Sequence, residues 1–194
     1  MIADKDLLSM QYARILAENA REAQKKLAGF PQEKLDQIVE HVAGEMEKHA
    51  RELAVMSFEE TDYGRWQDKL ISFVCRSVLR GLRGMRCVGT LREDAGGNVL
   101  EVGVPLGVIV ALCPSTSPVS TAIYKALLAI KSGNAIIFSL HPRAVRCMKR
   151  TLDLLIAAAE ECGLPEGCVS YLATSTRSGT IELMRHPATS LVLL

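Results

Sequence analysis

Three short polar segments, each placed directly after an apolar run, are the parts of this sequence best suited to binding or chemistry. They are Cys113-Pro114-Ser115-Thr116-Ser117-Pro118, Ser139-Leu140-His141-Pro142-Arg143-Ala144 and Ala173-Thr174-Ser175-Thr176. Hydroxyls and free amides can hydrogen-bond phosphate or amide oxygens, an imidazole can bond a ribose hydroxyl, and a guanidinium can pair with a phosphate. Because ligands of parallel sheets bind beyond the carboxyl ends of the strands, we expect these segments to surround a ligand site.

These segments also have a plain structural interpretation. Ser117 or Thr116 could cap the next helix with Pro118 at its first position, and spacing alone favours neither interpretation. His141 in a loop is more often a solvated side chain than a ligand. The sequence contains no G-x-G-x-x-G motif, no P-loop and no cluster of metal ligands. A standard dinucleotide-binding loop is therefore not supported, and no metal site is expected.

A row of arginines could also meet a phosphate-bearing ligand. They fall near one face of a helix expected at about 66–82, and they are Arg76, Arg80, Arg83 and Arg86. A solvated helix face is the favoured interpretation, because the rest of the chain shows no supporting basic patch.

Composition excludes several classes of protein. The chain has 194 residues, of which 48% are hydrophobic, and its 23 basic and 22 acidic side chains leave a net charge of +1. Such a chain has no overall field to hold nucleic acid or an anionic membrane. No apolar run approaches the roughly 20 residues of a membrane span, and no signal-peptide core opens the sequence. We therefore expect one or two domains in the cytoplasm.

The six cysteines show no metal-binding or redox spacing. No two of them are separated by only two residues, and most stand among aliphatic neighbours. We expect reduced, buried and inert thiols. Their positions are Cys75, Cys87, Cys113, Cys147, Cys162 and Cys168.

Hydrophobic periodicity predicts an α/β fold with helices first. Apolar stripes with helical spacing run over 8–27, 35–53 and about 66–82. Two extended segments, 87–90 and 99–102, flank a turn at 94–98 and predict a hairpin. After this hairpin, strands alternate with helices, which predicts right-handed crossovers and a parallel sheet. The expected strands are 106–112, 135–140, 169–172 and 190–194, and the expected helices are 119–131, 143–162 and 178–185.

This pattern divides the chain into three segments. Residues 1–86 are expected to form a helical segment, 87–103 a β-hairpin and 104–194 the first part of a nucleotide-binding domain. The last residues, Leu191-Val192-Leu193-Leu194, form an apolar strand with no polar tail. Because ligands bind beyond such strand ends, we expect the chain to be a truncated part of a larger α/β protein.

The order and spacing of several short motifs resemble the N-terminal part of the CoA-acylating aldehyde dehydrogenases. The match covers essentially the whole chain. Its parts are Ala23-Gln24-Lys25-Lys26-Leu27, Glu59-Glu60-Thr61, Tyr63-Gly64, Asp68-Lys69, Pro105-Leu106-Gly107-Val108-Ile109, Pro114-Ser115-Thr116-Ser117-Pro118, Lys131-Ser132-Gly133-Asn134-Ala135, His141-Pro142-Arg143-Ala144 and Leu183-Met184-Arg185-His186-Pro187.

The resemblance implies a Rossmann-like NAD domain of the aldehyde dehydrogenase type, a separate catalytic domain with a nucleophilic cysteine, and an oligomerisation arm. It implies that a thiolate attacks a small aldehyde, that NAD accepts the hydride, and that coenzyme A takes the acyl group. Pro114, Ser115, Thr116 and Ser117 would lie near the nicotinamide. His141, Pro142 and Arg143 would lie near the adenosine, and Ser139 is expected to be a further cofactor-binding residue. Arg143 could serve NAD or CoA, since both carry an adenosine with phosphates.

Two departures from the family bear on activity. The family usually has Asn between Thr and Pro in the first loop, where its amide helps to hold the oxyanion, and here that position is Ser117. None of the six cysteines matches the nucleophile, which would fall after Leu194 together with the helix that receives the NAD pyrophosphate. We therefore predict no catalytic residue in this chain and no aldehyde dehydrogenase activity of the chain alone.

The alternatives differ in class. The chain could belong to a non-acylating semialdehyde dehydrogenase or an acyl-phosphate reductase. It could instead be a catalytically inactive module that binds a nucleotide or a partner, or a scaffold subunit. A homo-oligomer or self-association is expected, because a truncated sheet exposes an apolar edge. The protein could be located in a bacterial microcompartment instead of free in the cytoplasm.

Overall fold

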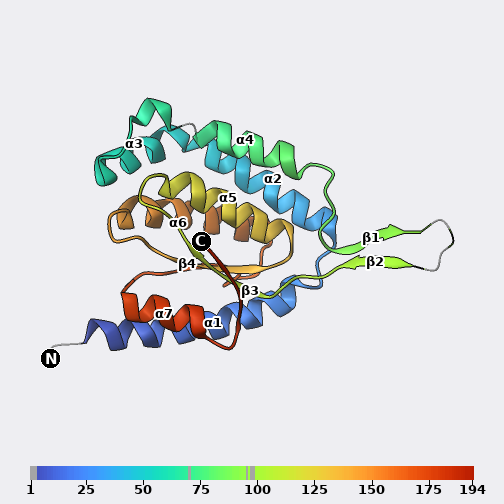
Figure 1. Ribbon diagram of the computed structural model, residues 1–194. Coiled ribbons are helices and arrows are strands. Elements are labelled where there is room, and N and C mark those ends of the chain that lie inside the picture. Colours follow the sequence, from blue (N-terminus) through green and yellow to red (C-terminus); the bar gives the residue numbers. More distant parts are fainter. Residues whose placement is uncertain (1–3, 70, 95, 97–98) are drawn as a thin grey trace.

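A four-stranded parallel sheet lies between two layers of helices (Figure 1). The computed structural model describes residues 4–69, 71–94, 96 and 99–194. The sheet comprises β3 (Val108–Leu112), β4 (Ala135–Ser139), β5 (Val169–Leu172) and β6 (Thr189–Leu193) in the spatial order β5-β4-β3-β6. All of β4 and most of β3 are buried, which explains why they are continuous apolar runs. The predicted α/β fold with a parallel sheet is confirmed.

Helices cover both faces of this sheet. One face carries α5 (Pro118–Lys131) and α6 (Val145–Glu161), which are covered in turn by α2 (Gln32–Lys48), α3 (Ala50–Thr61) and α4 (Ile71–Leu82). The other face carries α1 (Lys5–Leu27) and α7 (Arg177–Arg185). No described helix is both long and apolar enough to cross a membrane.

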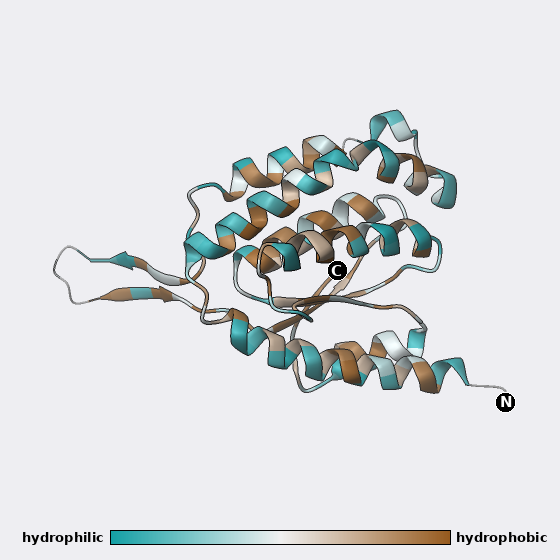
Figure 2. Ribbon diagram, turned by 180° about the vertical axis from the view of Figure 1, so that it is seen from behind, coloured by the Kyte–Doolittle hydropathy of each residue, from teal (hydrophilic) through white to brown (hydrophobic). Residues whose placement is uncertain are grey.

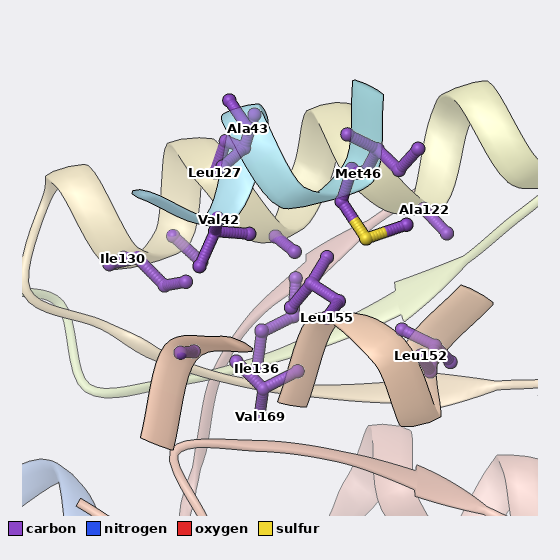
Figure 3. Packing of buried hydrophobic residues seen from close by; sticks show 14 of the residues in the cluster. Val42, Ala43, Met46, Ala122, Leu127, Ile130, Ile136, Leu152, Leu155 and Val169 are labelled. Carbon is purple, nitrogen blue, oxygen red and sulfur yellow. The ribbon is translucent and has the colours of Figure 1, made fainter. Parts of the chain in front are cut away.

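The main core joins the early helices to the sheet. Val42 of α2 lies beside Leu127 of α5, and Leu155 of α6 lies directly over Ile136 of β4 (Figure 3). Helices from 1–86 and strands from 104–194 thus share one apolar core. The division of the chain into three segments stays a prediction.

Two helix boundaries differ from the sequence-based expectation. The apolar stripe over 35–53 belongs to two helices, because the backbone leaves the helical conformation at His49 (φ −95°, ψ 5°). The helix expected at about 66–82 consists of a 3₁₀ turn, η1 (Trp66–Asp68), followed by α4 from Ile71.

The hairpin projects away from the body of the molecule (Figure 1). It pairs β1 (Gly89–Glu93) with β2 (Leu100–Gly103) in antiparallel fashion. Within the predicted turn, Ala95, Gly97 and Asn98 lie outside the described residues. Much of β2 is hydrophobic (Figure 2), and Leu100 and Val102 are each more than half exposed.

One amide side chain fixes the base of this hairpin. The Oε1 of Gln32 accepts hydrogen bonds from the backbone N–H groups of Cys87 (2.6 Å) and Val88 (3.1 Å). Its Nε2 donates to the carbonyl of Lys131 (3.1 Å) and to Asp36 (2.9 Å). The buried Lys131 ammonium also pairs with Asp36 at 2.5 Å. The network ties α2, α5 and the hairpin together at one point.

A tight turn sets the start of β4 beside β3. Asn134 accepts a hydrogen bond from the N–H of Gly107 (2.9 Å) and donates to the hydroxyl and carbonyl of Ser132. Gly133 has φ +68°, and a Cβ there would lie 2.9 Å from Pro105. Only glycine fits this turn without strain.

Candidate functional site

The three polar segments begin at one edge of the sheet. The register pairs Leu112 of β3 with Ser139 of β4, and Ser139 with Leu172 of β5. The strands therefore end at the same level, and the segments that follow them are neighbours, as predicted. Cys113 of the first segment lines a cavity together with the second and third segments, whereas Thr116 and Ser117 border a different one.

The second and third segments line one cavity of about 320 Å³. The Ser139 hydroxyl lies there at 3.0 Å from Ser175 Oγ and at 2.7 Å from Thr180 Oγ1. His141, Pro142 and Arg177 also contribute to its walls. This group of hydroxyls beside an imidazole can hydrogen-bond a sugar. Sequence reasoning missed Thr180 and Arg177, because only folding brings α7 against the end of β4, and it did not place Cys113 in the wall of this cavity.

His141 and Arg143 take different positions. The Nδ1 of the half-buried His141 accepts the backbone N–H of Arg143 at 3.1 Å. The Arg143 side chain is exposed, is not among those that line the cavity, and has no ion pair within the described part of the chain. It is free to meet an anionic group at the edge of the site.

The third segment is held by α1. The Ser9 hydroxyl donates to the carbonyl of Thr174 (2.5 Å) and accepts the N–H of Thr176 (3.3 Å). Thr176 then caps α7 by accepting the N–H of Gly179 at 3.1 Å. The close approach leaves no room for a side chain at Gly179, where a Cβ would collide with Ser9.

The N-terminus of α6 is closed by a carboxylate from another helix. Glu60, near the end of α3, accepts the N–H groups of Arg146 and Cys147, each at 2.7 Å. A helix N-terminus is a natural anion site, and here the protein's own carboxylate fills it. A nucleotide phosphate cannot use these amides while Glu60 is in place.

The first segment borders a second cavity of about 410 Å³. Ser117 stands at the N-cap position of α5 with Pro118 at the first turn, but its side chain caps no backbone N–H and lies 3.3 Å from Thr121 Oγ1. The Lys69 ammonium donates to the carbonyl of Thr116 at 3.3 Å, and burial lowers the pKa of Lys69. In the sequence, the Asp68-Lys69 motif is the feature that points to Lys69, and it does not indicate the contact with Thr116.

A third hollow is an apolar groove of about 640 Å³ between α4 and α5. Its walls include Phe73, Val78 and Leu82 of α4, and Tyr124 and Leu128 of α5. The groove shares Val74 and Ser120 with the cavity that holds Thr116 and Ser117. It therefore opens directly beside the first polar segment.

A buried lysine joins two strand ends near this segment. Lys125 of α5 is 5% exposed, and its ammonium donates to the carbonyls of Leu112 (2.6 Å) and Leu193 (3.0 Å). It holds the carboxyl ends of β3 and β6 together. The burial of Lys125 depends on these two contacts between distant parts of the chain, which spacing along the sequence does not indicate.

Two of the four arginines in and after α4 pair with glutamates of α2. Arg76 pairs with Glu47 at 2.9 Å and Arg86 with Glu33 at 3.3 Å, both on α2. These exposed pairs fit the solvated face that the sequence favoured. Among the described residues, no group of three or more His, Cys, Asp or Glu side chains could hold a metal ion.

Comparison with known proteins identifies the family. The sequence profile of the aldehyde dehydrogenase family matches residues 2–194. The chain belongs to the aldehyde dehydrogenase family. The resemblance to its CoA-acylating members is confirmed by the relatives that follow.

Two solved aldehyde dehydrogenases share the fold closely. A probable aldehyde dehydrogenase from Listeria monocytogenes is 43% identical with a TM-score of 0.95, and the match covers 98% of this chain and 42% of that one. An acetylating aldehyde dehydrogenase from Geobacillus thermoglucosidasius is 38% identical with a TM-score of 0.95, over 98% and 43% of the two chains. The acetylating acetaldehyde dehydrogenase EutE of Salmonella typhimurium is 32% identical over 96% of this chain and 38% of its own length.

This aldehyde dehydrogenase chain is shorter than its relatives. It spans about a fifth of the aldehyde-alcohol dehydrogenases it matches and about two fifths of the solved aldehyde dehydrogenases. More distant structures of the same fold, each 24% identical, hold NADP⁺ in an engineered glycolyl-CoA reductase and CoA in a propionaldehyde dehydrogenase from Rhodopseudomonas palustris. Another, from Clostridium phytofermentans, is a microcompartment enzyme.

The thiols of this aldehyde dehydrogenase chain are all unpaired. Burial raises the pKa of Cys75 and Cys113 to about 11, and that of Cys147 and Cys168 to about 12. At neutral pH these four are thiols rather than thiolates, so they are poor nucleophiles. Cys113, which precedes Pro114, is therefore well suited to packing and poorly suited to attack.

Proposed function

We propose that this chain provides the nucleotide-binding scaffold and the oxyanion-side loop of a CoA-acylating aldehyde dehydrogenase. The observation that carries the proposal is the close match over 98% of the chain to an acetylating enzyme, at 38% identity. In the overall reaction an aldehyde, CoA and NAD⁺ give acyl-CoA, NADH and a proton. A cysteine thioester is the intermediate, and none of the thiols of this chain is proposed to form it.

The cavity beside β4 fits the adenosine end of NAD or CoA. Ser139, Ser175 and Thr180 offer hydroxyls for a ribose, and the exposed guanidinium of Arg143 offers a partner for a phosphate. When bound, NAD supplies a hydride acceptor to the reaction. Because Glu60 fills the N-terminus of α6, the protein's phosphate contacts must come from other groups.

The first polar segment is proposed to lie beside the reacting carbonyl. Ser117 replaces the Asn usual in the family, and its hydroxyl already has Thr121 as a neighbour at 3.3 Å. Lys69 holds the carbonyl of Thr116 and brings a positive charge to the same cavity, which favours a developing negative charge on oxygen. The adjoining apolar groove is proposed to take the carbon chain of the aldehyde.

A catalytically inactive module remains a second candidate. The four buried thiols with raised pKa values favour it for the chain by itself, because they leave no activated nucleophile among these cysteines. Both candidate functions, the dehydrogenase scaffold and the inactive module, include binding of a nucleotide. They differ in whether a separate portion with the cysteine completes the site.

Replacement of Arg143 by alanine tests the nucleotide site. Loss of a charge-assisted contact to phosphate should weaken the binding of NAD⁺, CoA or both by about tenfold. Calorimetric titration of the chain with each ligand measures this. Arg146→Ala, which removes another exposed arginine nearby on α6, is the matched control and should leave both affinities unchanged. Unchanged affinity of Arg143→Ala for both ligands would reject the assignment of Arg143.

Self-association is proposed through exposed apolar strands. β6 pairs with β3 and has no second neighbour among the described strands, and Leu100 and Val102 of the hairpin are each more than half exposed. Sedimentation velocity is expected to show dimers or larger species. The double variant Leu100→Lys, Val102→Lys should shift the distribution toward monomer. A monomeric parent chain would contradict the proposal.

A further inference from the structure

We propose that the outer edge of β5 binds an extended, basic segment of a partner protein, which lies there as an added strand of the sheet. The inference is independent of the proposed function, because the groove along this edge shares no lining residue with the three hollows described above. Three features support it: an unpaired strand edge, a groove that follows the edge, and carboxylates without a cation at its start.

β5 is an edge strand of the described sheet, since it pairs with β4 on one side only. The N–H of Ile136 donates to the carbonyl of Cys168 at 2.7 Å. With the parallel register, this bond directs the N–H and C=O groups of Val169 and Tyr171 away from β4, where they have no partner within the described part of the chain. Ser170, between them, has a buried hydroxyl that also lacks a hydrogen-bond partner among the described residues. Such an edge is a template for another extended chain.

A groove of about 290 Å³, called the β5 groove below, follows this edge between two helices. α1 and α6 cover opposite faces of the sheet (Figure 1), and each contributes to the groove, with Leu16 from α1 and Ile156 from α6. The side chain of Val169 packs in the core, while the half-buried Tyr171 donates its hydroxyl to Asp153 at 2.6 Å. Apolar surface therefore flanks the edge on both sides, where alternate side chains of an added strand can cover it.

Carboxylates near the start of β5 give the β5 groove a preference for a basic partner. Glu160 of α6 and Glu166, in the turn before β5, both line the groove, and neither forms an ion pair within the described residues. Burial and the neighbouring Glu166 carboxylate raise the pKa of Glu160. Among the described residues that line the groove there is no lysine or arginine. A lysine or arginine of the added strand would supply the missing positive charge.

A second copy of this chain is a poor occupant of the same edge. Glu160 and Glu166 lie near the start of β5, and Asp153 lies beside Tyr171 further along the strand. Two copies joined along this edge would bring the carboxylates of both chains into one interface. Repulsion between like charges opposes such a dimer, whereas a basic strand is attracted to the same groups.

The experiment titrates the chain with a designed peptide as the probe. The acetylated hexapeptide alternates threonine and valine between two terminal lysines, and its matched control has glutamates in place of the lysines. Hydrogen exchange of the isotope-labelled chain, followed by NMR, reports where the peptide binds. With the lysine peptide, exchange of the N–H groups of Val169 and Tyr171 should slow at least roughly tenfold. The glutamate peptide should bind at least roughly tenfold more weakly.

Substitutions in the β5 groove test the role of its charge. The double variant Glu160→Gln, Glu166→Gln should weaken binding of the lysine peptide roughly three- to tenfold, because it removes both carboxylates. Glu161→Gln is the matched control, since Glu161 also lies in the last turn of α6 but does not line the groove. This control should bind the lysine peptide as the parent chain does.

Several results would overturn the inference. They are the absence of binding by the lysine peptide, equal binding of the two peptides, equal binding by the double variant and the parent chain, and slower exchange confined to β6, the other edge strand of the described sheet. Slow exchange of the Tyr171 N–H in the free chain that becomes faster on dilution would also overturn it, because a second copy would then cover the edge.

Discussion

Glu60→Gln is expected to lower the free energy of unfolding by about 2 kcal/mol. The substitution keeps the shape of the side chain but replaces one carboxylate oxygen by an NH₂ group. That group faces a backbone N–H of α6, where Glu60 now accepts from both Arg146 and Cys147 at 2.7 Å. One charge-assisted bond is weakened, and the other is replaced by a contact between two donors.

Urea denaturation followed by circular dichroism measures this loss, and the thermal midpoint should fall by about 4–8 °C. Glu59→Gln is the matched control, since Glu59 is its exposed neighbour on α3 and should change stability by less than about 0.5 kcal/mol. Equal stability of the two variants would show that the Glu60 contact contributes little. Stronger anion binding at α6 in Glu60→Gln would be a separate sign that the site had been opened.

The isolated chain is expected to form no NADH from acetaldehyde, CoA and NAD⁺. Acyl transfer through a thioester needs a thiolate close to the carbonyl. Burial keeps Cys113, the first residue of the first polar segment, protonated with a pKa of about 11. Cys162 lies at the opposite end of α6 from the candidate site, where its carbonyl accepts a bond from Lys34, and Cys87 lies at the base of the hairpin.

An absorbance assay for NADH checks this expectation, with the acetylating enzyme of Geobacillus thermoglucosidasius as the positive control. Raising the pH to about 9 should not produce activity, because a group with a pKa of about 11 remains almost wholly protonated there. Formation of NADH that is abolished by Cys113→Ala would show that this cysteine is the nucleophile after all.

Strands and crossovers could be predicted from the sequence because the signal is local. The segments that form β3 and β4 are buried on both faces. Their continuous apolar residues are typical of such strands and allow this to be predicted. The boundary between α2 and α3 could not be predicted, because Leu53 continues the apolar stripe past the bend at His49. The spacing of apolar residues indicates which side of a helix is buried. It does not indicate where the helix axis changes direction.

The candidate site can be predicted only in part from the sequence. The segments after β3, β4 and β5 are expected to be neighbours, because topology alone brings strand ends together. The contacts that complete it join residues far apart in sequence, such as Lys69 with Thr116 and Ser139 with Thr180. The Glu59-Glu60-Thr61 motif does not indicate that the Glu60 carboxylate caps a distant helix. Such pairings depend on packing angles between helices, which spacing along the chain does not encode.

The amide of Gln32 has a mechanical consequence for the hairpin. It binds the first residues of the projecting arm and the last turn of α5 at the same time. A force that bends the arm must therefore stretch these hydrogen bonds or pull on α5, and α5 forms one wall of the groove. A displacement of the hairpin would therefore be transmitted through Gln32 to α5, and so to one wall of the groove between α4 and α5.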